Sequence, residues 1–276
     1  MGIFKRYGLL NRPVFRDPIT VSPKNTLGLD EAPLLAGENN RYFFDFPLLT
    51  QQVDRIKILS TGRNLVTLVI GERGSGKTTL LNHFLRTSGL SWQYYRLEMP
   101  TDENQLPSSP GHPLFISDEG DGSRLVIDDA HLLDRVEMKQ VLASAWTATH
   151  GRKLKVRRRR LAGIILFCEP RLRASLADLS QYLPAASVIN RLYMPTLNRQ
   201  RTEAYLAYRI RAAGFLRVLP FSPSQLDEIH LLSRGLPGWV NGEAFMLYRR
   251  IQAAEQHARH IANFAAGLET QGLAAT

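Results

Sequence analysis

The sequence predicts an α/β protein in which a parallel sheet is followed by an all-helical C-terminal part. Short runs of β-branched and other apolar residues recur up to residue 194, as expected for parallel strands covered on both faces. From Leu197 onward, apolar residues recur instead every three or four positions, which is typical of helices. With 276 residues, the chain is long enough for one α/β domain and a smaller second domain.

The first predicted strand leads directly into a glycine-rich turn. Leu65–Ile70 is a nearly continuous apolar run, and residues 71–78 read GERGSGKT, which fits the pattern G-x-x-x-x-G-K-[ST]. In this pattern, glycines let backbone N–H groups turn toward a polyphosphate at the positive end of the following helix. An incidental lysine in a glycine-rich turn is the alternative, and the strand and helix on either side argue against it. The predicted ATP-binding residues are Gly71, Glu72, Arg73, Gly74, Ser75, Gly76, Lys77, Thr78 and Thr79.

Two carboxylates follow a second apolar run at residues 125–127. At the carboxyl end of a strand beside the phosphate loop, Asp128 is placed to hold the water shell of Mg²⁺ and Asp129 to orient an attacking water. Aspartates also favour helix starts, and this pair alone would fit that role equally well. Together with Lys77, which would reach the β- and γ-phosphates, the pair predicts a Walker B motif. We therefore expect Thr78 and Asp128 to bind Mg²⁺ and Asp129 to be catalytic, with slow hydrolysis because aspartate is shorter than glutamate.

Composition narrows the class of protein. Hydrophobic residues make up 44% of the chain, as in globular proteins, and no apolar run approaches the ~20 residues that span a bilayer. The first ten residues lack a signal-peptide core, and the single cysteine, Cys168, allows neither an internal disulfide nor a thiolate metal cluster. We therefore expect a cytoplasmic protein. A net charge of +10 makes a polyanionic partner plausible.

The densest positive charge lies before the predicted strand at residues 161–167. Residues 151–160 read GRKLKVRRRR. Three interpretations stay open: a solvated surface loop, a contact for the phosphate backbone of duplex DNA, or a contact for an anionic membrane surface. The residues that would contact nucleic acid are Lys153, Lys155, Arg157, Arg158, Arg159 and Arg160.

Periodicity and turn residues predict the other elements. Residues 100–123 are rich in proline, glycine and acids, which indicates a loop where a helix between parallel strands would be expected. The remaining predicted elements are helices over residues 46–60, 133–150 and 170–176, strands over 92–99 and 187–194, and three helices after residue 197, the second starting at Pro223.

Three further segments carry a resemblance to a known family. Residues 168–172 read CEPRL, residues 205–214 read YLAYRIRAAG, and residues 233–241 read SRGLPGWVN. With the two Walker motifs and the YGL at residues 7–9, these segments resemble the AAA+ ATPases. Among them the chain is most similar to general secretion pathway protein A (the ExeA type) and to the ATPase-like domain of DamX-type proteins.

The resemblance implies a P-loop NTPase fold of the AAA+ kind, with a parallel-sheet core and a C-terminal helical lid. It divides the chain into an N-terminal extension (1–60), a nucleotide-binding core (61–195) and a lid with a tail (196–276). It also implies ATPase activity with ATP and Mg²⁺, a homo-oligomer, and coupling to assembly or partner remodelling. The alternative is a nucleotide-gated DNA-binding adaptor with little turnover, like the transposition-associated AAA+ proteins.

By position, the resemblance assigns roles to three further residues. Glu169 falls at the sensor-1 position, where a carboxylate would repel the γ-phosphate. Arg191 matches the arginine offered to a neighbouring subunit's γ-phosphate, although a simple salt bridge at the strand end is the alternative. Gly238 stands where the secretion-type members carry a sensor-2 arginine. Without that cation, nucleotide binding is better supported than efficient turnover.

Overall fold

The structure is a computed structural model that describes Leu34 and residues 42–61, 65–90, 92–96, 124–144, 163–172, 188–213 and 219–273. The described residues form two compact units: one lies within residues 38–195, and the other contains Leu34 and residues from 196 onward. Residues 1–33, 100–123 and 153–160, on which several sequence predictions fall, lie outside the described residues. The three-domain division with boundaries at residues 60 and 195 stays a prediction.

The first unit is built on a five-stranded parallel sheet in the order β2-β3-β4-β1-β5. The strands are β1 Leu65–Ile70, β2 Trp92–Arg96, β3 Arg124–Asp128, β4 Gly163–Cys168 and β5 Val188–Tyr193. Each corresponds to an apolar or alternating run in the sequence, so the prediction of an α/β fold with a parallel sheet is confirmed. Strand β1 lies inside the sheet, between β4 and β5. The loop that follows it therefore starts beside the ends of two other strands.

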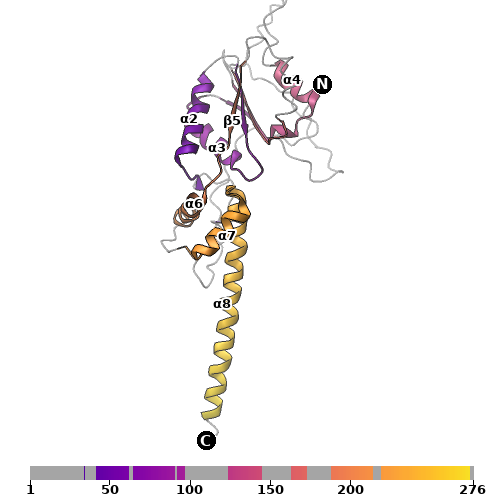
Figure 1. Ribbon diagram of the computed structural model, residues 1–276. Helices are drawn as coiled ribbons and strands as arrows, with labels where there is room; N and C mark the ends of the chain where they lie inside the picture. The colour runs from indigo at the N-terminus through magenta and orange to yellow at the C-terminus, as the bar shows by residue number, and fades with distance from the viewer. Residues whose placement is uncertain are drawn as a thin grey trace, which may run out of the picture. The chain divides into compact units, whose positions relative to one another are not determined.

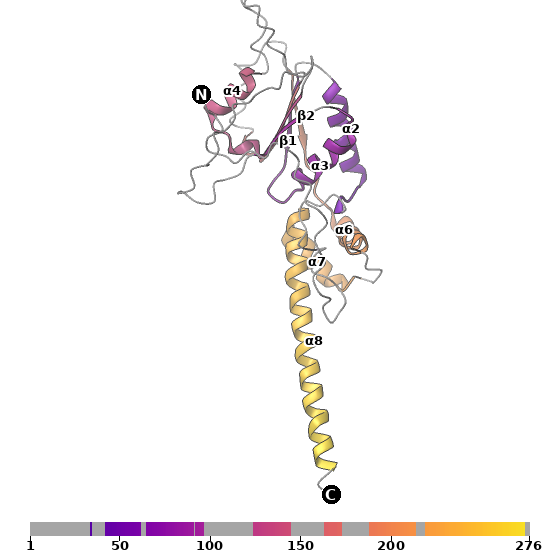
Figure 2. The same ribbon diagram turned by 180° about the vertical axis from the view of Figure 1, so that it is seen from behind.

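Helices cover both faces of this sheet (Figures 1 and 2). Helices α2 (Pro47–Thr61) and α3 (Lys77–Thr87) lie on one face, and α4 (Arg135–Ser144) lies on the other. Helix α2 turns its apolar side inward, where Val53 and Ile56 are buried, as its predicted amphipathic pattern requires. The short 3₁₀ helix η3 (Ala130–Leu132) precedes α4.

The helix predicted from residue 133 begins two residues later. Asp134 ends the preceding turn, and its carboxylate accepts a hydrogen bond from the N–H of Glu137 at 2.8 Å. The Glu137 carboxylate in turn accepts one from the N–H of Asp134 at 2.9 Å. This reciprocal capping box fixes the helix start at Arg135. Residues 145–150, the predicted end of this helix, lie outside the described residues.

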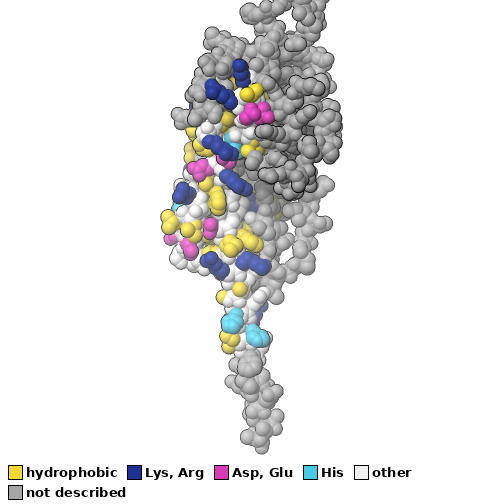
Figure 3. All heavy atoms as spheres, turned by 90° about the vertical axis from the view of Figure 1, so that its right-hand side faces the viewer, with side chains coloured by type: hydrophobic (Ala, Val, Ile, Leu, Met, Phe, Trp, Pro, Cys, Tyr) yellow, Lys and Arg dark blue, Asp and Glu magenta, His cyan; other side chains and the backbone are white. Residues whose placement is uncertain are grey.

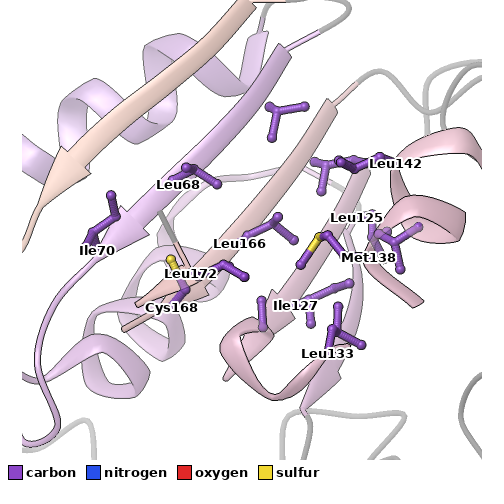
Figure 4. Packing of buried hydrophobic residues seen from close by; sticks show 14 residues of the cluster. Leu68, Ile70, Leu125, Ile127, Leu133, Met138, Leu142, Leu166, Cys168 and Leu172 are labelled. Carbon is purple, nitrogen blue, oxygen red and sulfur yellow. The ribbon is translucent and has the colours of Figure 1, made fainter. Parts of the chain in front are cut away.

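The core between the sheet and α4 consists of buried apolar side chains. Figure 4 shows the inward side chains of β1, β3 and β4 meeting those of α4 and the residues just before it. The labelled members are Leu68, Ile70, Leu125, Ile127, Leu133, Met138, Leu142, Leu166, Cys168 and Leu172. The Cys168 side chain is fully buried, and burial raises the pKa of its thiol to about 12, so this cysteine is unreactive at neutral pH.

The second unit is helical, with α6 (Arg199–Ala212), α7 (Pro223–Ser233) and the long α8 (Pro237–Leu273). The predicted start of a helix at Pro223 is confirmed, because Ser222 caps α7 through a capping box and proline occupies its first turn. Val240, Ala244 and Tyr248 form the buried stripe of α8. No helix in the described part of the chain combines the length and the apolar character needed to cross a bilayer.

Candidate functional site

The phosphate loop runs from Gly71 to Gly76 and joins β1 to α3. Neighbouring strands hold its start: the N–H of Gly71 donates to the carbonyl of Cys168 at 3.0 Å, and the N–H of Met194 donates to that of Ile70 at 2.8 Å. A Cβ atom at Gly71 would lie 2.4 Å from the Ser75 hydroxyl oxygen and 2.8 Å from the Met194 side chain. Glycine is therefore required here because the loop folds back closely on its own first residue.

Two other glycines turn the loop. Gly74 and Gly76 have φ angles of 82° and 87°, in the left-handed region that glycine enters without strain. Gly76 precedes α3, and no side chain caps this helix. The first backbone N–H groups of an α-helix have no acceptor within the helix. They point into the loop together with the positive end of the helix dipole, which suits an anionic ligand.

Lys77 places a positive charge inside this loop. Its side chain is buried, with 7% exposed, and Nζ donates to the carbonyl oxygens of Gly71 at 2.9 Å and Glu72 at 3.0 Å. The hydroxyl oxygen of Ser75 is also buried and has no hydrogen-bond partner among the described residues. The loop thus holds a buried ammonium group and a hydroxyl group without a hydrogen-bond partner. Both can donate hydrogen bonds to the oxygens of a phosphate group.

The loop meets the end of β3 through one hydrogen bond. The Thr78 hydroxyl donates to Oδ2 of Asp128 at 2.8 Å, and the Asp128 side chain is fully buried. Burial, and next the repulsion from Asp129, raise the pKa of Asp128 to about 6, and the Thr78 hydrogen bond offsets only part of this rise. A hydroxyl and a carboxylate in contact are hard oxygen ligands of the kind that Mg²⁺ shares with substrate phosphates. Their geometry therefore fits the predicted Mg²⁺ ligands, an assignment that stays a prediction.

The raised pKa of Asp128 predicts how stability depends on pH in the nucleotide-free protein. A carboxyl group whose pKa is higher in the folded than in the unfolded state binds more protons when folded, so stability falls as pH rises from 3.8 to about 6. In Asp128→Asn this contribution is absent. We expect the variant to gain about 2 kcal/mol relative to wild type between pH 4 and pH 7. Urea unfolding at unit pH intervals measures the difference, and a pH-independent difference would contradict the burial argument.

Asp129 adopts an uncommon backbone conformation at the end of β3. Its φ angle is 54°, which costs a residue with a side chain on the order of 1 kcal/mol. Its N–H donates to Oδ1 of Asp128 at 3.1 Å, and its own side chain makes no capping bond to η3. The helix-capping interpretation of the two aspartates is therefore wrong for η3, and Asp134 caps α4 instead.

Glu169 follows β4, and both of its carboxylate oxygens are in contact with nitrogen atoms. Oε1 lies 3.3 Å from Nε2 of His131, and Oε2 lies 3.3 Å from Nε of Arg171. The negative charge expected to repel a γ-phosphate is therefore partly balanced by Arg171. His131 is not among the site residues predicted from the sequence. The one available signal was a histidine two residues after Asp129, which fitted equally well into a helix start.

The other predicted site residues come from other segments of the chain. Arg191 is an exposed residue of β5 that pairs with Leu68, two positions before the end of β1. It makes no salt bridge within the described ranges, so the strand-end ion pair is not found there. Gly238 belongs to α8 of the second unit, and the basic run lies outside the described residues. The catalytic roles of Arg191 and Glu169 stay predictions.

The chain is similar to known proteins in sequence and in fold. No protein-family model matches the chain. General secretion pathway protein A of Aeromonas hydrophila is 25% identical over 78% of this chain, which spans 42% of that relative. Among solved structures, Cdc6p from Pyrobaculum aerophilum superposes with a TM-score of 0.51 at 15% identity, over 83% of this chain and 67% of the other. NtrX from Brucella abortus, in complex with ATP, superposes with a TM-score of 0.50 at 16% identity, over 76% and 54%.

At these identities the structural likeness speaks for the fold alone, and the sequence likeness is to general secretion pathway protein A. Both agree with the parallel sheet and with the glycine-rich loop at the end of β1. The chain therefore has the α/β P-loop NTPase fold and resembles general secretion pathway protein A and the AAA+ ATPases.

Proposed function

We propose that this protein binds ATP with Mg²⁺ in the Gly71–Thr78 loop and hydrolyses it slowly. The observation that carries the proposal is the 2.8 Å hydrogen bond from Thr78 to Asp128, with the buried Lys77 ammonium in the same loop. This contact joins the phosphate loop to the end of β3, and the Walker A and Walker B motifs predicted from the sequence lie in these two segments. Backbone N–H groups and Lys77 would bind the β- and γ-phosphates, and Thr78 and Asp128 would hold Mg²⁺.

Nucleotide binding would drive assembly into a homo-oligomer or the remodelling of a partner protein. The resemblance to general secretion pathway protein A supports this coupling, although the chain spans only 42% of that relative. Arg191 is exposed on β5, as a residue offered to a neighbouring subunit must be. The direct test is calorimetric titration with ATP at saturating Mg²⁺, followed by sedimentation with and without nucleotide. Absence of ATP binding would end the proposal.

The turnover number tests how well the site supports hydrolysis. We expect wild type to hydrolyse ATP at below about 1 s⁻¹, the low end of ordinary enzymes, because Asp129 is short and Gly238 supplies no cation. Asp129→Glu adds one methylene and is expected to raise the rate several-fold. Steady-state phosphate release measures both proteins. A wild-type rate well above this limit would show that these departures from the family pattern do not limit catalysis.

A second candidate function is a nucleotide-gated adaptor that assembles on duplex DNA. The favouring observations are the net charge of +10 and the concentration of that charge in residues 153–160. In Figure 3, the Lys and Arg side chains on the described part of one face are dispersed among apolar, acidic and uncharged ones. The run contains no aromatic residue to stack on single-stranded bases, so the duplex backbone is the expected target.

Replacing Arg157–Arg160 with alanine is expected to weaken binding to duplex DNA and to flatten its salt dependence. Each neutralised phosphate releases counterions, and removing four contacts should reduce the slope of log K against log salt by about 3 to 4. Fluorescence anisotropy across a salt series gives this slope, and vesicles containing anionic lipid test the membrane alternative. An unchanged slope on both ligands would leave the run as a solvated loop. Measuring ATP hydrolysis with and without the DNA then separates the motor from the adaptor.

A further inference from the structure

We propose that His131 is a catalytic residue of this site, which binds the attacking water together with Asp129 and accepts its proton while Glu169 holds the imidazole ring. This inference rests on the proposed ATP hydrolysis and names residues for it that the Walker motifs do not include. It also assigns Glu169 a different role from that of a γ-phosphate sensor.

The three side chains form a chain across the carboxyl ends of two adjacent strands. Asp129 and His131 follow β3, and Glu169 follows β4, which pairs with β3 in the sheet. Nε2 of His131 lies 3.3 Å from Oε1 of Glu169, and Nδ1 lies 4.0 Å from Oδ1 of Asp129. The His131 side chain is only 6% exposed, and its Nδ1 has no hydrogen-bond partner among the described residues.

These contacts select the tautomer of the ring. An ionised carboxylate is only an acceptor, so the nitrogen that faces Glu169, Nε2, carries the hydrogen in the neutral imidazole. Nδ1 is then an acceptor that faces a second acceptor, Oδ1 of Asp129. A distance of 4.0 Å is too long for a direct hydrogen bond between them. It does suit a water that donates one hydrogen bond of about 2.8 Å to each atom.

A lysine of the phosphate loop also acts electrostatically on the histidine. The charged and titratable groups that act on it are Glu169, Asp129, Arg171 and Lys77. Burial is the largest effect and lowers the pKa of His131, and the positive charges of Arg171 and Lys77 lower it further, against the opposing effect of the two carboxylates. The ring is therefore neutral at pH 7 and can accept a proton. The charge of Lys77 is among the effects on His131, as expected if the ring lies on the same side of the sheet edge as the ammonium that would hold the γ-phosphate.

The chemical step balances with these groups alone. The water oxygen forms a bond to the γ-phosphorus, and the bond from that phosphorus to the β–γ bridging oxygen breaks, so that ADP leaves with the electron pair. The proton of the water passes to Nδ1 of His131. The resulting imidazolium lies between the carboxylates of Asp129 and Glu169, which stabilise its charge. The proton then returns to the released phosphate or to solvent.

The arrangement explains how a site with a short second carboxylate can still position water. Asp129 supplies one hydrogen-bond acceptor for the water. His131 supplies the second, and its imidazole ring reaches further than the one methylene by which aspartate is shorter than glutamate. Glu169 fixes the ring, and Arg171 offsets the charge that Glu169 brings.

The first test is His131→Gln in the full chain. We expect kcat to fall about 100-fold while the affinity for ATP stays within about threefold, because a proton acceptor acts in the transition state and not in binding. His83→Gln is the matched control. His83 is another partly buried histidine with a lowered pKa, stacked on Phe43 in the same unit, and its replacement should leave kcat unchanged. A kcat within about threefold of wild type in a His131→Gln protein with an unchanged melting temperature overturns the inference.

A second measurement does not depend on activity and covers the case in which His131→Gln does not fold. Nitrogen-15 NMR of the wild-type imidazole in the absence of nucleotide should show the hydrogen on Nε2. In Glu169→Gln an uncharged amide replaces the carboxylate beside Nε2, and loss of the charge should lower the pKa of His131. A neutral ring protonated on Nδ1, or a pKa that does not respond to Glu169→Gln, contradicts the proposed chain.

The two proposals can fail separately. If wild type binds ATP and does not hydrolyse it, the role of His131 is overturned while nucleotide binding stands. If wild type does not bind ATP, the proposed function itself fails.

Discussion

Replacing Lys77 with alanine is expected to weaken ATP binding at saturating Mg²⁺ about 100-fold, the equivalent of removing charge-assisted hydrogen bonds worth about 3 kcal/mol. The Nζ atom is already held inside the loop by the carbonyls of Gly71 and Glu72, so little side-chain entropy is lost when a phosphate binds. Because the ammonium is pre-positioned, most of the free energy of its interaction with phosphate should contribute to the binding affinity. Isothermal titration calorimetry measures it directly.

Two further variants separate charge from structure. Lys77→Met keeps most of the aliphatic stem and removes the ammonium, so it should lose nearly as much affinity as Lys77→Ala. Lys139→Ala removes an exposed lysine of α4 in the same unit and should bind ATP like wild type. Unchanged affinity in a folded Lys77→Met protein would show that the loop does not bind a triphosphate through this residue.

The phosphate loop could be predicted because its determinants are local. A loop with a buried ammonium and tight turns needs glycine at particular positions, and the structure requires it at Gly71 by close packing and at Gly74 and Gly76 by positive φ. Those requirements fall within eight consecutive residues, 71–78, so the pattern is visible without knowing what surrounds it. The contact of Thr78 with Asp128 also followed, because both segments end strands at the same edge of the sheet.

The chain of Asp129, His131 and Glu169 could not be predicted from spacing. Its members come from segments about 40 residues apart that meet only because β3 and β4 are adjacent in the sheet. The sequence orders the strands along the chain, whereas the sheet inserts β4 between β1 and β3. Non-local pairing of this kind leaves no periodic signal, so His131 had no visible partner, whereas Arg171, the counter-charge of Glu169, lies only two residues away in the sequence.

The start of α4 could not be predicted from the apolar pattern either. The apolar pattern continued through Leu133, and the true start at Arg135 depends on reciprocal hydrogen bonds between Asp134 and Glu137. An Asp-x-x-Glu pair in a sequence suggests such a cap and does not by itself exclude a start two residues earlier.

The second unit carries the largest expected effect on stability. Replacing Gly235 with alanine should destabilise this unit by roughly 4 kcal/mol, the upper range for a single substitution. Gly235 has a φ angle of 69°, and a Cβ atom there would lie 2.0 Å from the carbonyl oxygen of Leu197. The contact cannot relax by a simple separation of the two segments, because the N–H of Leu197 donates to the carbonyl of Gly235 at 2.8 Å. Urea unfolding followed by circular dichroism measures the loss of helical structure.

Gly242 in α8 provides the matched control. A Cβ atom at Gly242 would meet nothing within 4 Å, and its backbone is helical. Gly242→Ala should therefore stabilise the same unit by about 0.5 to 1 kcal/mol, since alanine loses less conformational entropy than glycine in a helix. The two substitutions add the same methyl group and should shift the unfolding midpoint in opposite directions. If Gly235→Ala stabilised the unit as much as Gly242→Ala, the close approach to Leu197 would not determine the effect of the substitution at Gly235.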